Sequence, residues 1–143
     1  MENKSERAIN MADEKDRLAY EYQYYKAQLE EMQKQMNSVR MVSEELQGTI
    51  LALEGLKEAK EEALLPIGSA TYVKAKVSPK SKVLIDIGAR IILEKSPEEA
   101  KELLEKRKED LAKTAEKIAR NMEAIAGKMN EIASRISEKD APE

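Results

Sequence analysis

Apolar positions in the first part of the chain recur alternately every four and three residues. This 3.5-residue period predicts a left-handed coiled coil, because a globular amphipathic helix keeps a period of 3.6. The pattern predicts one helix over residues 17–62, of which residues 17–60 span about 65 Å at 1.5 Å per residue. Ser43 is its one polar interruption. The predicted seam consists of Leu18, Tyr22, Tyr25, Leu29, Met32, Met36, Val39, Ser43, Leu46, Ile50 and Leu53.

A second helix with the same period is predicted over residues 96–139, and 140–143 form a short tail. Ser96 has the position of an N-cap, Pro97 suits the first helical position, and Glu99 completes a capping box. Lys108 is the one residue that fits the seam poorly. The predicted seam consists of Leu104, Lys108, Leu111, Ala115, Ile118, Met122, Ile125, Met129, Ile132 and Ile136.

Residues 63–95, between the two helices, lose the helical period and alternate as β-strands do. The pattern predicts three or four short strands, arranged as one hairpin inside another. So few strands are marginally stable alone, and their edges are open to pairing with other chains. We therefore predict an oligomerisation hub, whose assembly residues are Ile67, Tyr72, Val73, Val77, Val83, Ile85, Ile87, Ile91 and Leu93.

The two predicted helices have similar lengths and a compact connection, so the simplest closure is an antiparallel pair. The predicted fold class is α+β, dominated by a long antiparallel two-helix coiled coil with a small β-hairpin hub between the helices. Residues 1–16 would overhang this pair. The repeat decays there, since Met11 keeps the seam position one heptad before Leu18 but Ile9 does not. We expect this extension to be a frayed helix end or disordered.

Composition supports an extended molecule and argues against an enzyme. More than half of the residues are Ala, Glu, Lys, Leu or Arg, and only 3% are aromatic. The chain lacks Cys and His, which removes thiolates, the commonest metal ligand and the commonest general base near neutral pH. We predict no catalytic, cofactor-binding or metal-binding residues. The tight acidic pairs Glu61–Glu62 and Glu98–Glu99 could suggest a carboxylate site, but they are better explained as charges at helix ends.

The net charge of −3 argues against general nucleic-acid binding. Residues 63–95 differ, with six basic and two acidic residues. This basic middle could be a solvated sheet face or a docking surface for an acidic partner. No apolar run has the character of a signal peptide or the length of a membrane span. We therefore expect a soluble cytoplasmic protein without membrane contact.

Three stretches resemble the alpha-type subunits of the prefoldin family, of archaeal type. They are LAYEYQ at Leu18–Gln23, LLPIGSATYVKAKV at Leu64–Val77 and VLIDIGARIILEKSPEEA at Val83–Ala100. Alpha-type subunits carry two β-hairpins where beta-type subunits carry one, and the middle of this chain is long enough for two. The chain departs from the family in its longer N-terminal extension and in Tyr72, where Phe is common.

The resemblance implies an ATP-independent holdase without cofactors. In that family two alpha and four beta subunits join their hairpins, and the coiled-coil tips bind non-native proteins that pass to a group II chaperonin. Flexible methionine suits such contacts, although Met122 and Met129 in the seam are better explained by ordinary packing. For Ile136, Ile9 and Met11, packing and client contact are both open. The alternative function is a structural coiled-coil or filament-forming prefoldin-like protein. The predicted client-binding residues are Ile9, Met11, Leu18, Met129, Ile132 and Ile136.

Overall fold

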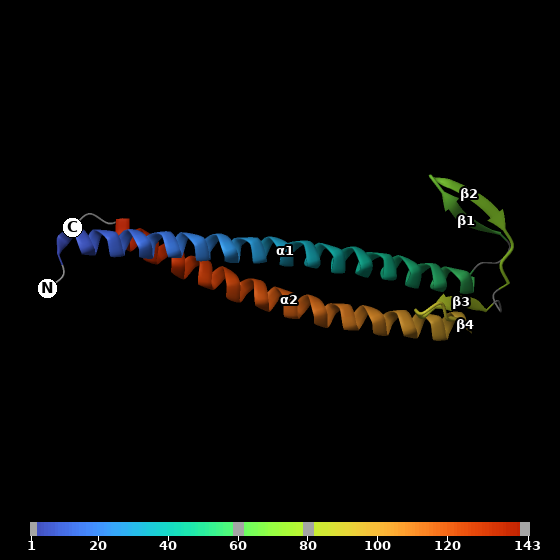
Figure 1. The fold of residues 1–143 in the computed structure, drawn as a ribbon. Coiled ribbons are helices and arrows are strands. Elements are labelled where there is room, and N and C mark those ends of the chain that lie inside the picture. Colours follow the sequence, from blue (N-terminus) through green and yellow to red (C-terminus); the bar gives the residue numbers. More distant parts are fainter. Residues whose placement is uncertain (1–2, 59–61, 79–81, 141–143) are drawn as a thin grey trace. The chain divides into compact units, whose positions relative to one another are not determined.

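Two long helices enclose four short strands in the chain order, as the sequence predicts (Figure 1). The computed structural model describes residues 3–58, 62–78 and 82–140. The elements are α1 (Lys4–Glu58), β1 (Ala63–Gly68), β2 (Thr71–Ala75), β3 (Val83–Asp86), β4 (Ile92–Lys95) and α2 (Pro97–Asp140). The chain divides into a central unit, residues 40–112, and a terminal unit, residues 1–39 and 113–143.

The predicted seams of both helices are confirmed. Every predicted seam residue, from Leu18 to Leu53 in α1 and from Leu104 to Ile136 in α2, is buried or half-buried. The N-cap is confirmed too, because the Glu99 amide donates a hydrogen bond to Ser96 Oγ over 3.2 Å. Helix α1 begins at Lys4, well before the predicted start at residue 17. At its start, the Asn3 amide donates a hydrogen bond to Glu6 Oε2 over 3.3 Å.

The two helices run antiparallel within each unit. In the central unit, Ile50 and Leu53 of α1 form a buried cluster with Ala100 and Leu104 of α2. In the terminal unit, the buried residues are Leu18 of α1 with Ile125, Met129 and Ile132 of α2. The early part of α1 thus accompanies the late part of α2, and the reverse holds in the central unit.

Lys108, the poor fit in the predicted seam, finds a polar partner across the helices. Its ammonium donates a hydrogen bond to Gln47 Oε1, and both residues lie in a groove of about 410 Å³. Glu105 and Glu109 line the same groove beside this ammonium. Lys108 therefore has a polar partner within the coiled coil, and neither helix is interrupted there.

Each strand pairs with its neighbour in sequence. The prediction of nested hairpins is therefore wrong, and the two β-hairpins that the resemblance implies for residues 63–95 are confirmed. Strand β1 pairs with β2 and β3 with β4, as two separate antiparallel sheets. The reason lies in the turns, where the backbone has positive φ at three successive positions. These are Gly68 (φ 123°), Ser69 (45°) and Ala70 (56°), and Gly88 (98°), Ala89 (51°) and Arg90 (61°). Backbone of this left-handed kind matches the twist of a tight hairpin.

The two hairpins are repeats of one another, offset by 20 residues. The pairs Ala63–Ala75 and Leu64–Lys74 in the first recur as Val83–Lys95 and Leu84–Glu94 in the second. The positive-φ turn recurs at the same offset. One local structure is therefore used twice in the hub.

Candidate assembly and client-binding surfaces

The β1–β2 hairpin carries exposed apolar side chains on both faces. Residues that oppose each other across an antiparallel pair lie on the same face. One face carries Leu65 opposite Val73, and the other carries Leu64 opposite Lys74. All four side chains are exposed. A two-stranded sheet with exposed apolar side chains on both faces is suited to burial between other elements.

The β3–β4 hairpin differs because one of its faces is partly covered. Val83 and Ile85 are half-buried and pack against the central cluster of α1 and α2. The opposite face presents Leu84 and Ile92, which are exposed, together with Asp86 and Glu94. Arg107 of α2 donates a hydrogen bond to the Asp86 carbonyl over 3.3 Å, which ties the hairpin to the helix.

The predicted assembly residues divide accordingly by exposure. Val77, Val83 and Ile85 are half-buried. The other six are exposed, namely Ile67, Tyr72, Val73, Ile87, Ile91 and Leu93.

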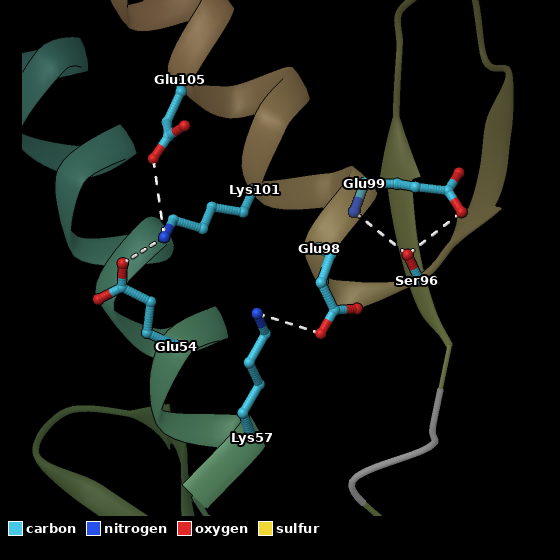
Figure 2. A network of polar contacts seen from close by, with 7 residues as sticks. All are labelled: Glu54, Lys57, Ser96, Glu98, Glu99, Lys101 and Glu105. Carbon is cyan, nitrogen blue, oxygen red and sulfur yellow. Dashed lines mark hydrogen bonds and ion pairs between the residues drawn. The ribbon is translucent and has the colours of Figure 1, made fainter.

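A network of charged side chains joins the helices where they meet the hub (Figure 2). Lys101 of α2 lies 2.7 Å from Glu54 of α1, and Lys57 lies 3.1 Å from Glu98. The hydrogen bond and charge of Lys101 lower the pKa of the Glu54 carboxyl, and Glu54 in turn raises the pKa of Lys101. These contacts hold the end of α1 against the start of α2, and they explain Glu98 as a structural charge.

The predicted client-binding residues fall into two classes in the terminal unit. Ile9 and Met11 are 61% and 49% exposed on the first turns of α1. Leu18, Met129 and Ile132 are buried between the helices, and Ile136 is half-buried. Residues 3–13 are exposed throughout. Apolar surface at this end is thus concentrated at the start of α1.

A group of ion pairs marks where α2 ends alongside α1. Lys139 Nζ lies 2.6 Å from Glu14 Oε2, Arg135 lies 3.7 Å from the same carboxylate, and Lys15 pairs with Asp140. The Lys139 hydrogen bond, followed by its charge, lowers the pKa of Glu14 below the ordinary value of 4.5. Since this pKa is lowered in the folded state, the charged Glu14 stabilises the folded state above pH 4.5, and this stabilisation is lost as the pH falls below that value.

We predict that acid loosens this end of the helix pair through Glu14. Spin labels are placed on Ser5→Cys and Ser137→Cys, which are both exposed positions. The distribution of distances between the two labels should broaden when the pH falls below 4.5. The chain has no native cysteine to interfere. In Glu14→Gln the distribution should already be broad at pH 7 and change less with pH. An unchanged distribution in Glu14→Gln at pH 7 would contradict this role.

The alternative of a carboxylate site receives no support within residues 3–58, 62–78 and 82–140. No group of three or more acidic side chains gathers there in a way that could hold a metal ion. Glu61, a member of one acidic pair, lies outside the described residues. Among the described helices, none has an apolar stretch long enough to cross a membrane.

Sequence reasoning missed the 20-residue repeat of the hub, in which Lys74 and Glu94 are equivalent positions. The signal was available, because Leu64, Ile67 and Gly68 recur as Leu84, Ile87 and Gly88. Alternation within each strand does not reveal this recurrence, which lies between two stretches 20 residues apart. The equivalence becomes evident once the register of both hairpins is known.

Comparison with known proteins agrees with this architecture. Residues 25–141 match the prefoldin family described as "Prefoldin subunit". The prefoldin subunit alpha of Thermofilum pendens is 35% identical over 99 residues, which cover 68% of this chain and 77% of that protein. Prefoldin subunit alpha of Methanothrix thermoacetophila is 36% identical, over 60% of this chain and 58% of that protein. That of Pyrococcus horikoshii is 34% identical, over 66% of each chain.

A solved structure shares the fold. The cryo-EM structure of filamentous PFD from Methanocaldococcus jannaschii superposes with a TM-score of 0.68. The match covers 79% of this chain and 95% of that chain at 23% sequence identity. The long helix pair, the two hairpins and the sequence matches lead to one conclusion. The chain belongs to the prefoldin family of chaperone subunits, as an alpha-type member.

Proposed function

We propose that this chain is a subunit of an ATP-independent holdase that binds non-native polypeptides in the cytoplasm. One observation carries the proposal: large apolar side chains are exposed both on the hub hairpins and on the first turns of α1. Exposed apolar surface of this extent marks interaction sites. One such surface serves assembly and the other serves client binding.

The hub is the assembly surface. Its exposed residues, among them Ile67, Tyr72 and Leu93, would be buried against beta-type prefoldin subunits in a complex of two alpha and four beta chains. The open edges of two separate two-stranded sheets support this role, because each edge offers unpaired backbone groups. The similarity to proteins named prefoldin subunit alpha supports the choice of partner.

Client binding belongs to the terminal unit. Ile9 and Met11 offer exposed apolar contacts, and a flexible methionine adapts to clients of different shape. Leu18, Met129 and Ile132 are buried between the helices and Ile136 is half-buried, so these residues would meet a client only when the helix pair opens. A client held in this way is passed to a group II chaperonin.

The test replaces Ile9 and Met11 with serine in the complex with beta-type subunits. The amount of complex needed to suppress aggregation of a denatured test protein, followed by light scattering without ATP, should rise about tenfold. This corresponds to about 1.4 kcal/mol shared between two interface truncations. The mass of the complex should not change.

The matched control replaces Met41 and Val42, which are exposed on α1 in the central unit, with serine. Suppression should then remain as in the wild type. Equal losses in both variants would show that client binding is not localised at the start of α1. A wild-type complex that does not suppress aggregation at all would sink the holdase proposal.

A second candidate is a filament-forming protein of the same family. The observation in its favour is the name of the structural neighbour, which describes a filamentous assembly. Electron microscopy of the chain purified without other subunits distinguishes the two. Fibres would favour the filament, and compact particles that form only with beta-type subunits would favour the holdase.

A further inference from the structure

Four of the five tyrosines of the chain lie within one stretch of six residues on α1, Tyr20–Tyr25. Tyr22 and Tyr25 occupy seam positions and are half-buried. Tyr20 and Tyr24 are 77% and 56% exposed, and their spacing of four residues places them on one face of the helix, away from the seam. Tyrosine is not a strong helix former. Neither helix pairing nor helix propensity therefore explains these two exposed rings.

The ring of Tyr24 is held in place although it is exposed. Gln28 Nε2 donates a hydrogen bond to the Tyr24 hydroxyl over 2.8 Å. The ring also meets that of Tyr25 edge-on, with centroids 5.6 Å apart and an angle of 65° between the planes. A ring that is already fixed loses little conformational entropy when a partner binds to it. Tyr24 is thus preorganised as a contact surface.

Carboxylates border the two exposed rings. Asp16 lies four residues before Tyr20, and Glu21 lies three residues before Tyr24, so each is a neighbour of a ring on the helix surface. Both carboxylates are exposed, and neither forms an ion pair with another residue in the described part of the chain. Among the residues three or four places from either ring, Arg17 is the one cation. This face therefore combines aromatic rings with an excess of negative charge.

A face of this kind is complementary to a cation. The face of an aromatic ring attracts a positive charge, and arginine suits it best because its planar guanidinium stacks on the ring while its N–H groups donate to carboxylates. The same stretch already shows such a contact once. Lys128 Nζ of α2 lies 5.3 Å from the centre of the Tyr25 ring. No cation of the described residues lies over the rings of Tyr20 or Tyr24.

The exposed rings continue the apolar surface at the start of α1. Tyr20 follows Ile9 by eleven residues, which is about three full turns, so the two side chains lie on the same face. Their separation along the helix is about 16 Å at 1.5 Å per residue. An extended polypeptide covers this length in about five residues. A segment that contacts Ile9 with an apolar side chain thus brings a residue about five places further along to Tyr20.

We propose that Tyr20 and Tyr24, bordered by Asp16 and Glu21, bind arginine side chains of non-native polypeptides. The preferred client segment then carries an apolar residue and an arginine about five residues apart. This inference rests on the proposed client-binding role of the terminal unit and adds a chemical preference to it.

The test measures the binding of labelled peptides to the complex with beta-type subunits by fluorescence anisotropy. The probe is an unstructured peptide with a pair of leucines and, about five residues further along, a pair of arginines. Two further versions carry lysine or glutamine in place of the arginines. The wild type should bind the arginine peptide about fivefold more tightly than the glutamine version and about twofold more tightly than the lysine version.

Two double variants separate the ring faces from the apolar area. Tyr20→Leu with Tyr24→Leu keeps apolar side chains but removes the rings, so the preference for arginine over glutamine should fall to about twofold or less. Tyr20→Phe with Tyr24→Phe keeps the ring faces and should retain most of the preference. Circular dichroism checks that both proteins keep their helix content.

A third double variant, Asp16→Asn with Glu21→Gln, removes the bordering charges. It should bind the arginine peptide about twofold more weakly, with less dependence on salt. The matched control is Glu44→Gln with Glu45→Gln, which removes two exposed carboxylates of α1 in the central unit. This control should keep the wild-type preference.

Three outcomes would overturn the inference. One is equal binding of the three peptides by the wild type, and another is an unchanged preference in the leucine variant. Equal losses in the phenylalanine and leucine variants would assign the contact to the hydroxyl groups and not to the ring faces. A wild-type complex that suppresses aggregation but shows no preference for arginine would refute this inference alone. A complex that neither binds the peptides nor suppresses aggregation would refute the holdase proposal as well.

Discussion

Leu53→Ala is expected to lower the free energy of unfolding by about 2–3 kcal/mol. Leu53 is 7% exposed and belongs to the cluster with Ile50, Ala100 and Leu104. Truncation removes buried methyl groups and leaves a cavity that a two-helix seam can only partly close. The helix itself should persist, because alanine is the best helix former. Denaturant unfolding followed by circular dichroism measures the change.

Leu51→Ala is the matched control, two residues away in the same helix. Leu51 is 56% exposed, so its truncation should change the free energy of unfolding by less than about 0.5 kcal/mol. The pair of variants keeps residue type, helix and neighbourhood constant and changes only burial. Equal effects would mean that the 3.5-residue seam does not determine which leucine supports the fold.

Replacing Tyr72 and Ile92 together with aspartate should abolish assembly. Tyr72 is 58% exposed on β2, and Ile92 is exposed at the equivalent position of β4. Two carboxylates buried without partners in an interface should weaken it at least about a hundredfold, or about 2.7 kcal/mol. Native mass spectrometry of the complex with beta-type subunits measures the loss.

The control for this double variant is Tyr20→Asp. Tyr20 is 77% exposed, but it lies on α1 in the terminal unit, away from the hairpins in sequence. Assembly should survive this change, and helix content should be kept in both proteins. If the hub variant still assembled, the exposed apolar residues of the hairpins would have to serve another purpose.

The helices could be predicted closely because one physical pattern determines them. A seam that alternates by fours and threes specifies which residues face the partner helix, and even Ser43 and Lys108 occupy their predicted positions. The start of α1 was harder to predict. Apart from Met11, the first heptads lack apolar seam residues. The contacts found there are polar, namely the Asn3–Glu6 hydrogen bond and the ion pairs of Glu14, and a pattern of apolar positions cannot predict them.

Strand alternation predicted the faces of the hub but not its pairing. Alternating apolar residues show which side chains share a face of a strand, but they do not show which strands are neighbours. The tighter turns after Gly68 and Gly88 determine the pairing instead, and their positive φ extends to Ser69, Ala70 and Arg90, which give no such signal in the sequence.

Exposure in the client-binding region could not be predicted from heptad position alone. Met11 and Leu18 occupy the same position one heptad apart, yet Met11 is 49% exposed and Leu18 is buried. The difference follows from where α2 ends, at Asp140 beside Lys15. The role of either residue in binding clients remains a prediction.

The 20-residue repeat has an evolutionary consequence. A single hairpin that meets its own copy uses each residue on both sides of the contact, so one substitution changes both sides at once. Two hairpins of the same local structure place equivalent positions at separate residues, as with Lys74 and Glu94. Each side can then mutate independently. One hairpin can therefore change its residue at such a position while the other hairpin keeps its own.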